Sequence, residues 1–289
     1  MNDKPTMTHE HTNRSQERLR PIAASASFGH QWWILQWILP SILVMMALCA
    51  WEVGVRLLQV SNWLLPPPSN ILMELVESRN LFLRHTWVTL KEVLLGFASA
   101  LMLGIAVAMA ISYSRVIERA AYPFVIASQT IPVIAIAPLL LIWIGYGIWP
   151  KIIVVVLVSF FPIVVNTVDG LKSADQDILN LMRTLGASKW QIFTKVQIPS
   201  SLPFLFSGIR VAITMSVIGA VIGEWVGASA GLGYLMTRSA PQFLTDRVFG
   251  AIFILSVMGI ALFSTVVLVE RYAMPWHWMK RQDKSMNRS

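Results

Sequence analysis

The stretch LPFLFSGIRVAITMSVIGAVIGEWV, residues 202–226, is an apolar run that contains only two charged side chains, Arg210 and Glu224. An α-helix needs about 20 consecutive apolar residues to cross roughly 30 Å of hydrocarbon. Small residues recur at four-residue spacing, and in lipid such ridges let helix backbones pack closely. The stretch therefore predicts a membrane-spanning helix that packs through two small-residue ridges. These ridges are Gly208, Ala212, Ser216 and Ala220, and Gly219, Gly223 and Gly227.

Five further apolar runs lie at residues 33–55, 87–112, 121–144, 152–168 and 248–269. The chain of 289 residues is 55% hydrophobic and only 13% charged, a composition that would leave a soluble globular surface short of charge. The sequence therefore predicts an all-α membrane protein with six transmembrane helices. The second span repeats the small-residue ridge with Gly96, Ala100, Gly104 and Ala108.

The Lys and Arg residues predict which side of the membrane each connection faces. Most of those outside the spans lie in the two termini and in the second and fourth connections. Cytoplasmic loops carry an excess of basic residues, so we expect both termini in the cytoplasm. The predicted organisation is a flexible polar tail at 1–30, a transmembrane domain at 31–271 and a basic tail at 272–289.

A few charged residues fall inside or beside the spans. Glu52 and Arg56 are four residues apart, which predicts a local ion pair on one helix. Lys91 and Glu92 are adjacent, and we expect both to extend toward the membrane interface.

The connection at 170–200, between the fourth and fifth spans, carries two helix signatures. Ser173 with Gln176 and Ser188 with Gln191 are capping-box patterns, which mark helix N-termini. Two short helices are therefore predicted on the cytoplasmic side.

The ends and faces of these two helices can also be predicted. Gly186 is placed to end the first helix in a left-handed conformation, and Pro199 to stop the second. Apolar residues recur at helical spacing in both, and such a pair either lies on lipid headgroups or docks a partner protein. They are Ile178, Leu181, Met182 and Leu185, and then Trp190, Ile192, Phe193 and Val196.

The segment NLMRTLGASKWQIFTKVQIP, residues 180–199, resembles the cytoplasmic loop of permeases of binding-protein-dependent ATP-binding-cassette importers. The family pattern is Glu-Ala-Ala, three residues, Gly, nine residues, Ile, one residue, Leu-Pro. Gly186 and Pro199 match its glycine and final proline, whereas residues 180–182 replace Glu-Ala-Ala. The resemblance implies a coupling-helix loop that docks an ATPase subunit. The coupling residues it implies are Asn180, Leu181, Met182, Arg183, Leu185, Gly186, Ala187, Trp190, Phe193 and Pro199.

The resemblance extends over residues 66–271 and narrows to one subgroup. The motifs that carry it are Pro66-Pro67-Pro68-Ser69, Ile131-Pro132, Phe161-Pro162 and Gly231-Leu232-Gly233-Tyr234. They are similar to permeases for nitrate, taurine, aliphatic sulfonates and pyrimidine precursors of thiamine. A pyrimidine thiamine precursor is the substrate it favours, with a sulfonate, taurine or nitrate as alternatives.

The resemblance also implies the setting in which the chain works. It implies a permease subunit in the bacterial inner membrane, two ATPase subunits, an external solute-binding protein and a second copy of this chain. A related second permease in place of that copy is an open alternative.

A translocation pathway needs polar groups that face water at membrane depth. Pro132 frees a backbone carbonyl beside Gln129 and Thr130 in the third span, although an ordinary kink would leave the same pattern. Glu224 is costly in an apolar span unless it is paired or wet. With Ser216 on the fifth span, these residues are the predicted pathway.

The chain lacks the motifs of covalent chemistry. No Gly-x-x-x-x-Gly-Lys-Ser/Thr occurs in the 289 residues, so ATP is expected on the partner and no cofactor on this chain. The histidines lack metal-site spacing, no hydrolase or protease motif occurs, and the basic residues form no nucleic-acid stripe. We predict a non-enzymatic transporter. The alternative is an ion-driven secondary transporter, which would need inverted repeats and charges at the membrane midplane.

Overall fold

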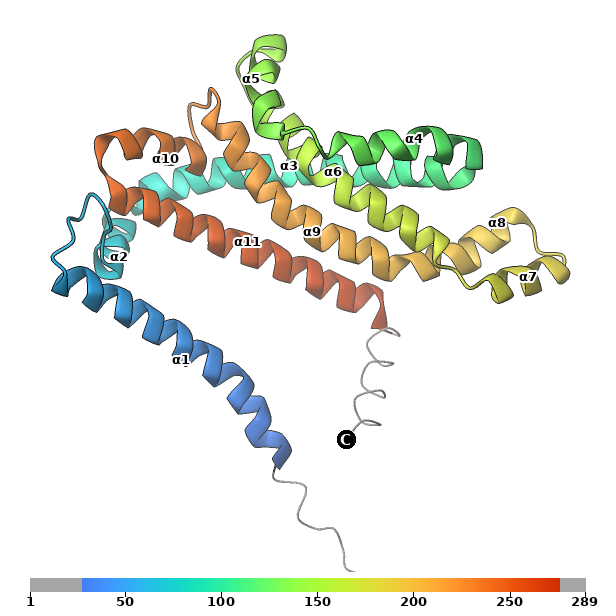
Figure 1. Cartoon of the computed structure of the whole chain (residues 1–289), viewed down its shortest axis with the longest axis horizontal. Helices are drawn as coiled ribbons and strands as arrows, with labels where there is room; N and C mark the ends of the chain where they lie inside the picture. Colours follow the sequence, from blue (N-terminus) through green and yellow to red (C-terminus); the bar gives the residue numbers. More distant parts are fainter. Residues whose placement is uncertain (1–27, 276–289) are drawn as a thin grey trace, which may run out of the picture. The chain divides into compact units, whose positions relative to one another are not determined.

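The computed structural model describes residues 28–275, and every element in that range is a helix (Figure 1). The described chain forms two units, residues 28–59 and 60–275. The first unit is α1 (Phe28–Leu57), a long apolar helix. The predicted pair on α1 is confirmed, because Arg56 Nε donates to Glu52 Oε1 at 2.6 Å. Most of the predicted terminal tails lies outside the described residues.

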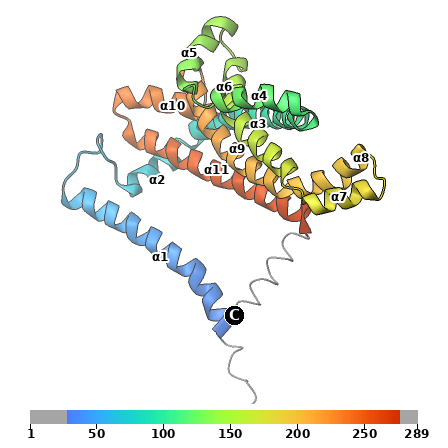
Figure 2. The same cartoon turned by 45° about the vertical axis from the view of Figure 1, so that its right-hand side comes forward.

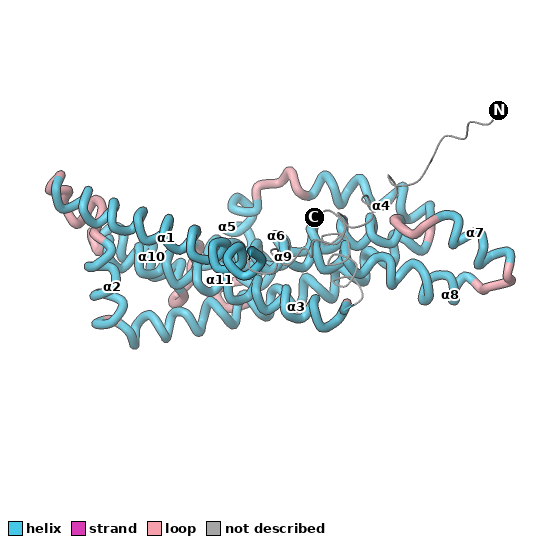
Figure 3. The backbone as a smooth tube through the Cα atoms, turned by 90° about the horizontal axis from the view of Figure 1, so that it is seen from below, coloured by secondary structure: helices cyan, strands magenta, loops and turns pink. Residues whose placement is uncertain are grey.

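The second unit contains the remaining helices. They are α2 (Pro68–Glu77), α3 (Arg79–Tyr113), α4 (Arg115–Ser128), α5 (Val133–Ile144), α6 (Trp149–Lys172), α7 (Gln176–Thr184), α8 (Lys189–Ile192), the π-helix η1 (Phe193–Gln197), α9 (Ile198–Trp225), α10 (Leu232–Ser239), the 3-10 helix η2 (Ala240–Gln242) and α11 (Thr245–Ala273). Seen from below in Figure 3, α7 and α8 lie at one end of this unit and α2 and α10 at the other.

Five helices of the described chain are long and apolar enough to cross a membrane, and α4 with α5 makes a sixth span if the bent pair is counted as one. The predicted span at 121–144 is therefore broken, with an angle of 96° between its two halves. The break lies at residues 129–132, because Pro132 has no N–H to donate and disfavours a helical conformation at Ile131.

The core of the second unit forms where α6 packs between α3 and α9 (Figure 2). The predicted ridges of small residues make these contacts. A methyl group at Gly96 would lie 2.5 Å from Val155 Cβ, and one at Gly208 would lie 2.7 Å from the Pro162 carbonyl oxygen. The helices pack so closely because these positions carry no side chain.

Candidate coupling loop and buried polar cluster

The first loop helix, α7, begins two residues later than the sequence predicts. Its N-cap is Asp175, whose carboxylate accepts a hydrogen bond from the Asp177 N–H at 2.8 Å. The predicted cap, Ser173, instead donates to the Gly170 carbonyl at 2.8 Å and completes the last turn of α6. The prediction at Ser173 is wrong because its hydroxyl pairs with the helix that precedes it.

The turn between α7 and α8 confirms the prediction at Gly186. This glycine has φ +78°, a left-handed conformation that L side chains rarely adopt. Its N–H donates to the Arg183 carbonyl and the Ala187 N–H donates to the Met182 carbonyl, each at 3.0 Å. This pair of bonds is a Schellman motif, which satisfies the last carbonyls of α7.

The start of α8 confirms the second capping box. The Gln191 N–H donates to the Ser188 hydroxyl at 3.3 Å, and the Gln191 side chain accepts from the Ser188 N–H at 2.8 Å. Pro199, however, does not stop this helix. The chain continues through η1 into α9, so that residues Lys189–Trp225 form one helical path. A π turn just before Pro199 widens the helix where the proline cannot donate a hydrogen bond.

The loop helices have a buried face and an exposed face. Leu179 and Ile192 are buried with Ala174 in a small core between the helices. On the other face, four apolar side chains are between 47% and 72% exposed, and we call them the coupling patch. It consists of Ile178, Leu181, Leu185 and Trp190.

The predicted coupling residues divide between these faces. Met182, Ala187 and Phe193 are partly buried, and the others are exposed, which are Asn180, Leu181, Arg183, Leu185, Gly186, Trp190 and Pro199. The Asn180 side chain, at the position of the family's Glu, accepts from Arg183 at 2.9 Å. The inward direction of Leu179 is not in the prediction, although its spacing to Met182 could have indicated it.

The predicted pathway residues do not share one environment. Gln129, Thr130 and Pro132 lie exposed in the break between α4 and α5. Ser216 is fully buried, and its hydroxyl donates to the Ile213 carbonyl at 2.7 Å. Glu224, the fifth predicted residue, is buried at the far end of α9.

Glu224 holds the start of α10 in place. Its carboxylate accepts hydrogen bonds from the Thr89 hydroxyl at 2.6 Å and from the Gly233 N–H. The Thr89 hydroxyl in turn accepts from the Leu232 N–H at 2.8 Å, and His85 Nδ1 accepts from the Gly231 N–H at 3.0 Å. We call His85, Thr89 and Glu224 the α10 anchor. It satisfies three successive backbone donors that the first turn of α10 would otherwise leave unpaired.

Gly231 cannot be replaced without displacing this anchor. Its φ is +123°, and a methyl group on its Cα would overlap the Glu224 carboxylate. The glycine is therefore needed both for its backbone conformation and for the space it leaves.

A buried ion pair connects α3 and α6. Glu92 is 2% exposed and lies 2.6 Å from the Lys151 ammonium. The expectation that Glu92 extends to the interface is wrong, because Lys151 in the first turn of α6 reaches its carboxylate inside the bundle. Lys91 does remain exposed, with its ammonium 5.1 Å from the centre of the Trp87 ring. Neither residue of the ion pair was singled out as a site from the sequence.

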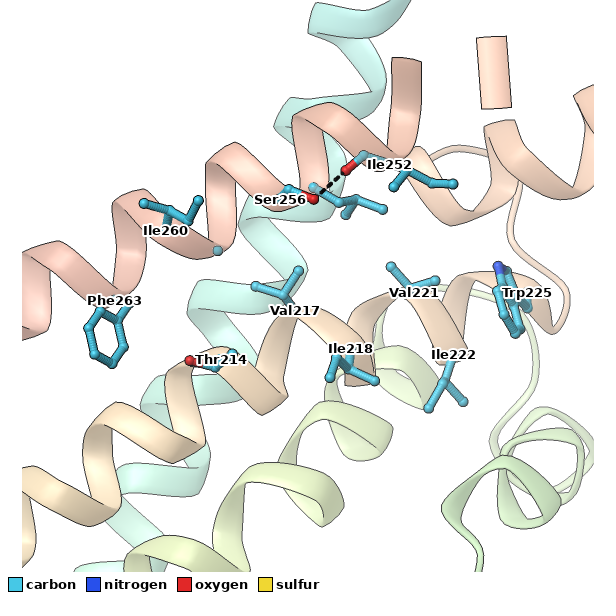
Figure 4. Close-up of a pocket in the computed structure, with 12 residues that line it drawn as sticks. Thr214, Val217, Ile218, Val221, Ile222, Trp225, Ile252, Ser256, Ile260 and Phe263 are labelled. Atoms are coloured by element: carbon cyan, nitrogen blue, oxygen red, sulfur yellow. Dashed lines mark hydrogen bonds between the residues drawn. The ribbon is translucent and has the colours of Figure 1, made fainter. Parts of the chain in front are cut away.

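A groove of about 700 Å³ is lined by residues of α9 and α11 (Figure 4). Val217, Val221 and Ile260 are among the side chains that line it, and Thr214 and Ser256 are its hydroxyl groups. The Ser256 hydroxyl donates to the Ile252 carbonyl of its own helix. None of the predicted pathway residues lines this apolar groove.

Residues 100–273, more than half of the chain, match the family described as binding-protein-dependent transport system inner membrane component. The chain belongs to this family, and it is a permease of a binding-protein-dependent ATP-driven importer. This confirms the predicted class of transport protein and its multi-pass inner-membrane setting.

Individual relatives are similar over most of their length. The chain is 43% identical over 238 residues to the formylaminopyrimidine transport permease protein ThiX of Halalkalibacterium halodurans, which covers 82% of this chain and 95% of the relative. It is 30% identical over 247 residues to the putative aliphatic sulfonates transport permease protein SsuC of Bacillus subtilis, which covers 84% and 88%.

The fold is also found among solved transporters. A chain of the inward-facing MetNI methionine ABC transporter matches with a TM-score of 0.60 at 18% identity, covering 68% of this chain and 97% of that chain. This likeness concerns the helical architecture, which confirms the predicted all-α fold of a membrane subunit.

Proposed function

We propose that this permease moves a pyrimidine precursor of thiamine into the cell and that an ATPase dimer docks on the loop at 170–200. ATP binds to that partner. A second copy of the chain completes the pathway, a solute-binding protein delivers the substrate outside, and both termini lie in the cytoplasm.

The exposed coupling patch is the observation that carries the docking site. Leu181, Leu185 and Trp190 are between 59% and 72% exposed, whereas Leu179 and Ile192 behind them are buried. The helices therefore have their own core, and the patch is left for a partner. Apolar side chains at the centre of an interface gain stability by leaving water.

The continuous path from α8 to α9 supports a role as a lever. The loop helices join the membrane helix through η1 without a break in helical structure. A displacement of α8 by the ATPase would therefore be transmitted along α9. At the far end of α9, Glu224 is bonded to the first turn of α10.

The substrate class rests on the relatives. ThiX, at 43% identity, is named as a formylaminopyrimidine permease, and SsuC, at 30% identity, is named as a putative permease for aliphatic sulfonates. Uptake of labelled formylaminopyrimidine and taurine by the reconstituted importer tests this choice. Uptake of taurine alone would replace the pyrimidine with a sulfonate substrate.

The docking site is tested by co-purification of the ATPase with Gly186→Arg. The substitution strains the left-handed turn and should splay α7 from α8, so bound ATPase activity should be lost. Gly145→Arg is a matched control, because Gly145 also has positive φ and no atom within 4 Å of an added methyl, but it lies between α5 and α6. Equal ATPase recovery from both variants would refute the docking site.

A further inference from the structure

A polar pocket lies beside the α10 anchor and shares His85 with it. It is a pocket of about 320 Å³ between α3, α10 and the start of α11. None of its lining residues is acidic. Its polar lining includes Arg84, His85, Tyr234, Arg238, Ser239 and Arg247.

The charge of this pocket is positive. Arg247 is paired with Glu74 at 2.8 Å, but within residues 38–275 no carboxylate lies within ion-pair distance of Arg84 or Arg238. The Arg238 guanidinium lies 6.0 Å from the centre of the Tyr234 ring, whose other neighbour is the stacked His85 ring. Two guanidinium groups are therefore available to an anion.

Two buried side chains add unpaired donors. Ser239 is 3% exposed, and its hydroxyl bonds to no side chain or backbone group of the described chain. His85 is 7% exposed, and its Nδ1 accepts from the Gly231 N–H. Because Nδ1 is an acceptor, the ring proton lies on Nε2, which makes that nitrogen a donor without a described partner. Both residues line the pocket, so their donors can reach a molecule that binds there.

We infer that this pocket binds a carboxylate or a comparable small oxyanion. Guanidinium groups form short, charge-assisted bonds to such oxygens, and the hydroxyl and imidazole donors would complete the coordination. The anion can be free in solution or be an acidic side chain of the solute-binding protein. Binding of an acidic side chain of the solute-binding protein rests on the proposed function, whereas binding of a free anion does not.

The first experiment measures binding of sodium acetate to the purified full-length chain in lipid nanodiscs. Ligand-observed NMR at constant ionic strength should give a saturable signal. Arg238→Gln and Ser239→Ala should each weaken it by roughly tenfold, because a hydrogen bond to a charged group contributes about that factor. Ser239→Ala removes a hydroxyl without a bonded partner, so its fold should be unaffected. Arg79→Gln, an exposed arginine at the start of α3, is the matched control.

The second experiment measures how the solute-binding protein stimulates ATPase activity of the reconstituted importer. If that protein supplies the carboxylate, the two variants should raise its half-maximal concentration by roughly tenfold. If acetate binding falls in the variants while stimulation is unchanged, the ligand is a free anion. If both variants leave acetate binding and stimulation equal to wild type, the inference is wrong. A chain that recruits no ATPase would refute the proposed function, and the acetate measurement would still decide this site.

Discussion

The two ends of the helical path Lys189–Trp225 are built differently. At the loop end, Gly186 turns in open space and apolar side chains face outward. At the α10 end, Gly231 turns against a buried carboxylate, and three backbone donors are bonded to the anchor. The loop end therefore has an exposed apolar surface, whereas the turn at the α10 end is held by hydrogen bonds within the chain.

The largest effect on stability is expected at the buried ion pair near the α10 end. Lys151→Met would leave the Glu92 carboxylate buried without its partner, which costs about 3–5 kcal/mol. Thermal unfolding in detergent should show a strongly lowered midpoint, whereas Lys91→Met should not. The double variant with Glu92→Met should recover much of the loss, and a Lys151→Met midpoint equal to wild type would show that the pair contributes little.

The two left-handed glycines provide the next comparison. Gly186→Ala costs only the backbone strain of about 1–2 kcal/mol. Gly231→Ala adds a clash with the Glu224 carboxylate and should cost clearly more. Unfolding midpoints of the two variants, measured side by side, check the ranking. Equal midpoints would mean that the Glu224 carboxylate moves aside for the added methyl group at no cost in stability.

A smaller effect is expected when one member of the anchor is removed. Thr89→Val leaves the Leu232 N–H and one Glu224 oxygen without their partner, which costs about 1–3 kcal/mol. Thr86→Val is the matched control, since that hydroxyl bonds only to its own helix at Phe82. The contrast between the two fails if both variants unfold at the same temperature.

The smallest effect on stability is expected at the coupling patch, where the effect on function should be large. Leu185 is 72% exposed, so Leu185→Asp should change stability by no more than about 0.5 kcal/mol. It should nevertheless abolish co-purification of the ATPase. An exposed apolar residue elsewhere, Leu72→Asp on α2, should leave the ATPase bound. If Leu185→Asp retains the ATPase, the coupling patch is not part of the interface with the ATPase.

Features that depend on neighbouring residues in the sequence could be predicted. Apolar length gives the spans, glycine spacing gives the close packing on α6, and the Gly186 turn follows from its local pattern. Predictions from local patterns are wrong at two positions. The Ser173 hydroxyl bonds to the preceding helix and does not cap the next one, and a π turn lets the helix continue through Pro199.

The buried polar cluster could not be predicted because its partners are distant in sequence. Glu92 and Lys151 are 59 residues apart, and Thr89 and Glu224 are 135 apart. The sequence shows that the Glu224 carboxylate needs a partner. Only the packing of the helices determines that Thr89 and the turn at Gly231 lie beside it. The same holds for Glu92, whose neighbour Lys91 faces outward.

If α9 works as a lever, the loop and the α10 anchor are mechanically connected through it. Hydrogen exchange at the backbone N–H groups of residues 231–233 tests it in the reconstituted importer, with and without ATP and vanadate. We expect nucleotide trapping to change this exchange in wild type and in Gly145→Arg, but not in Gly186→Arg. Exchange that is identical in both nucleotide states of the wild-type importer would contradict it.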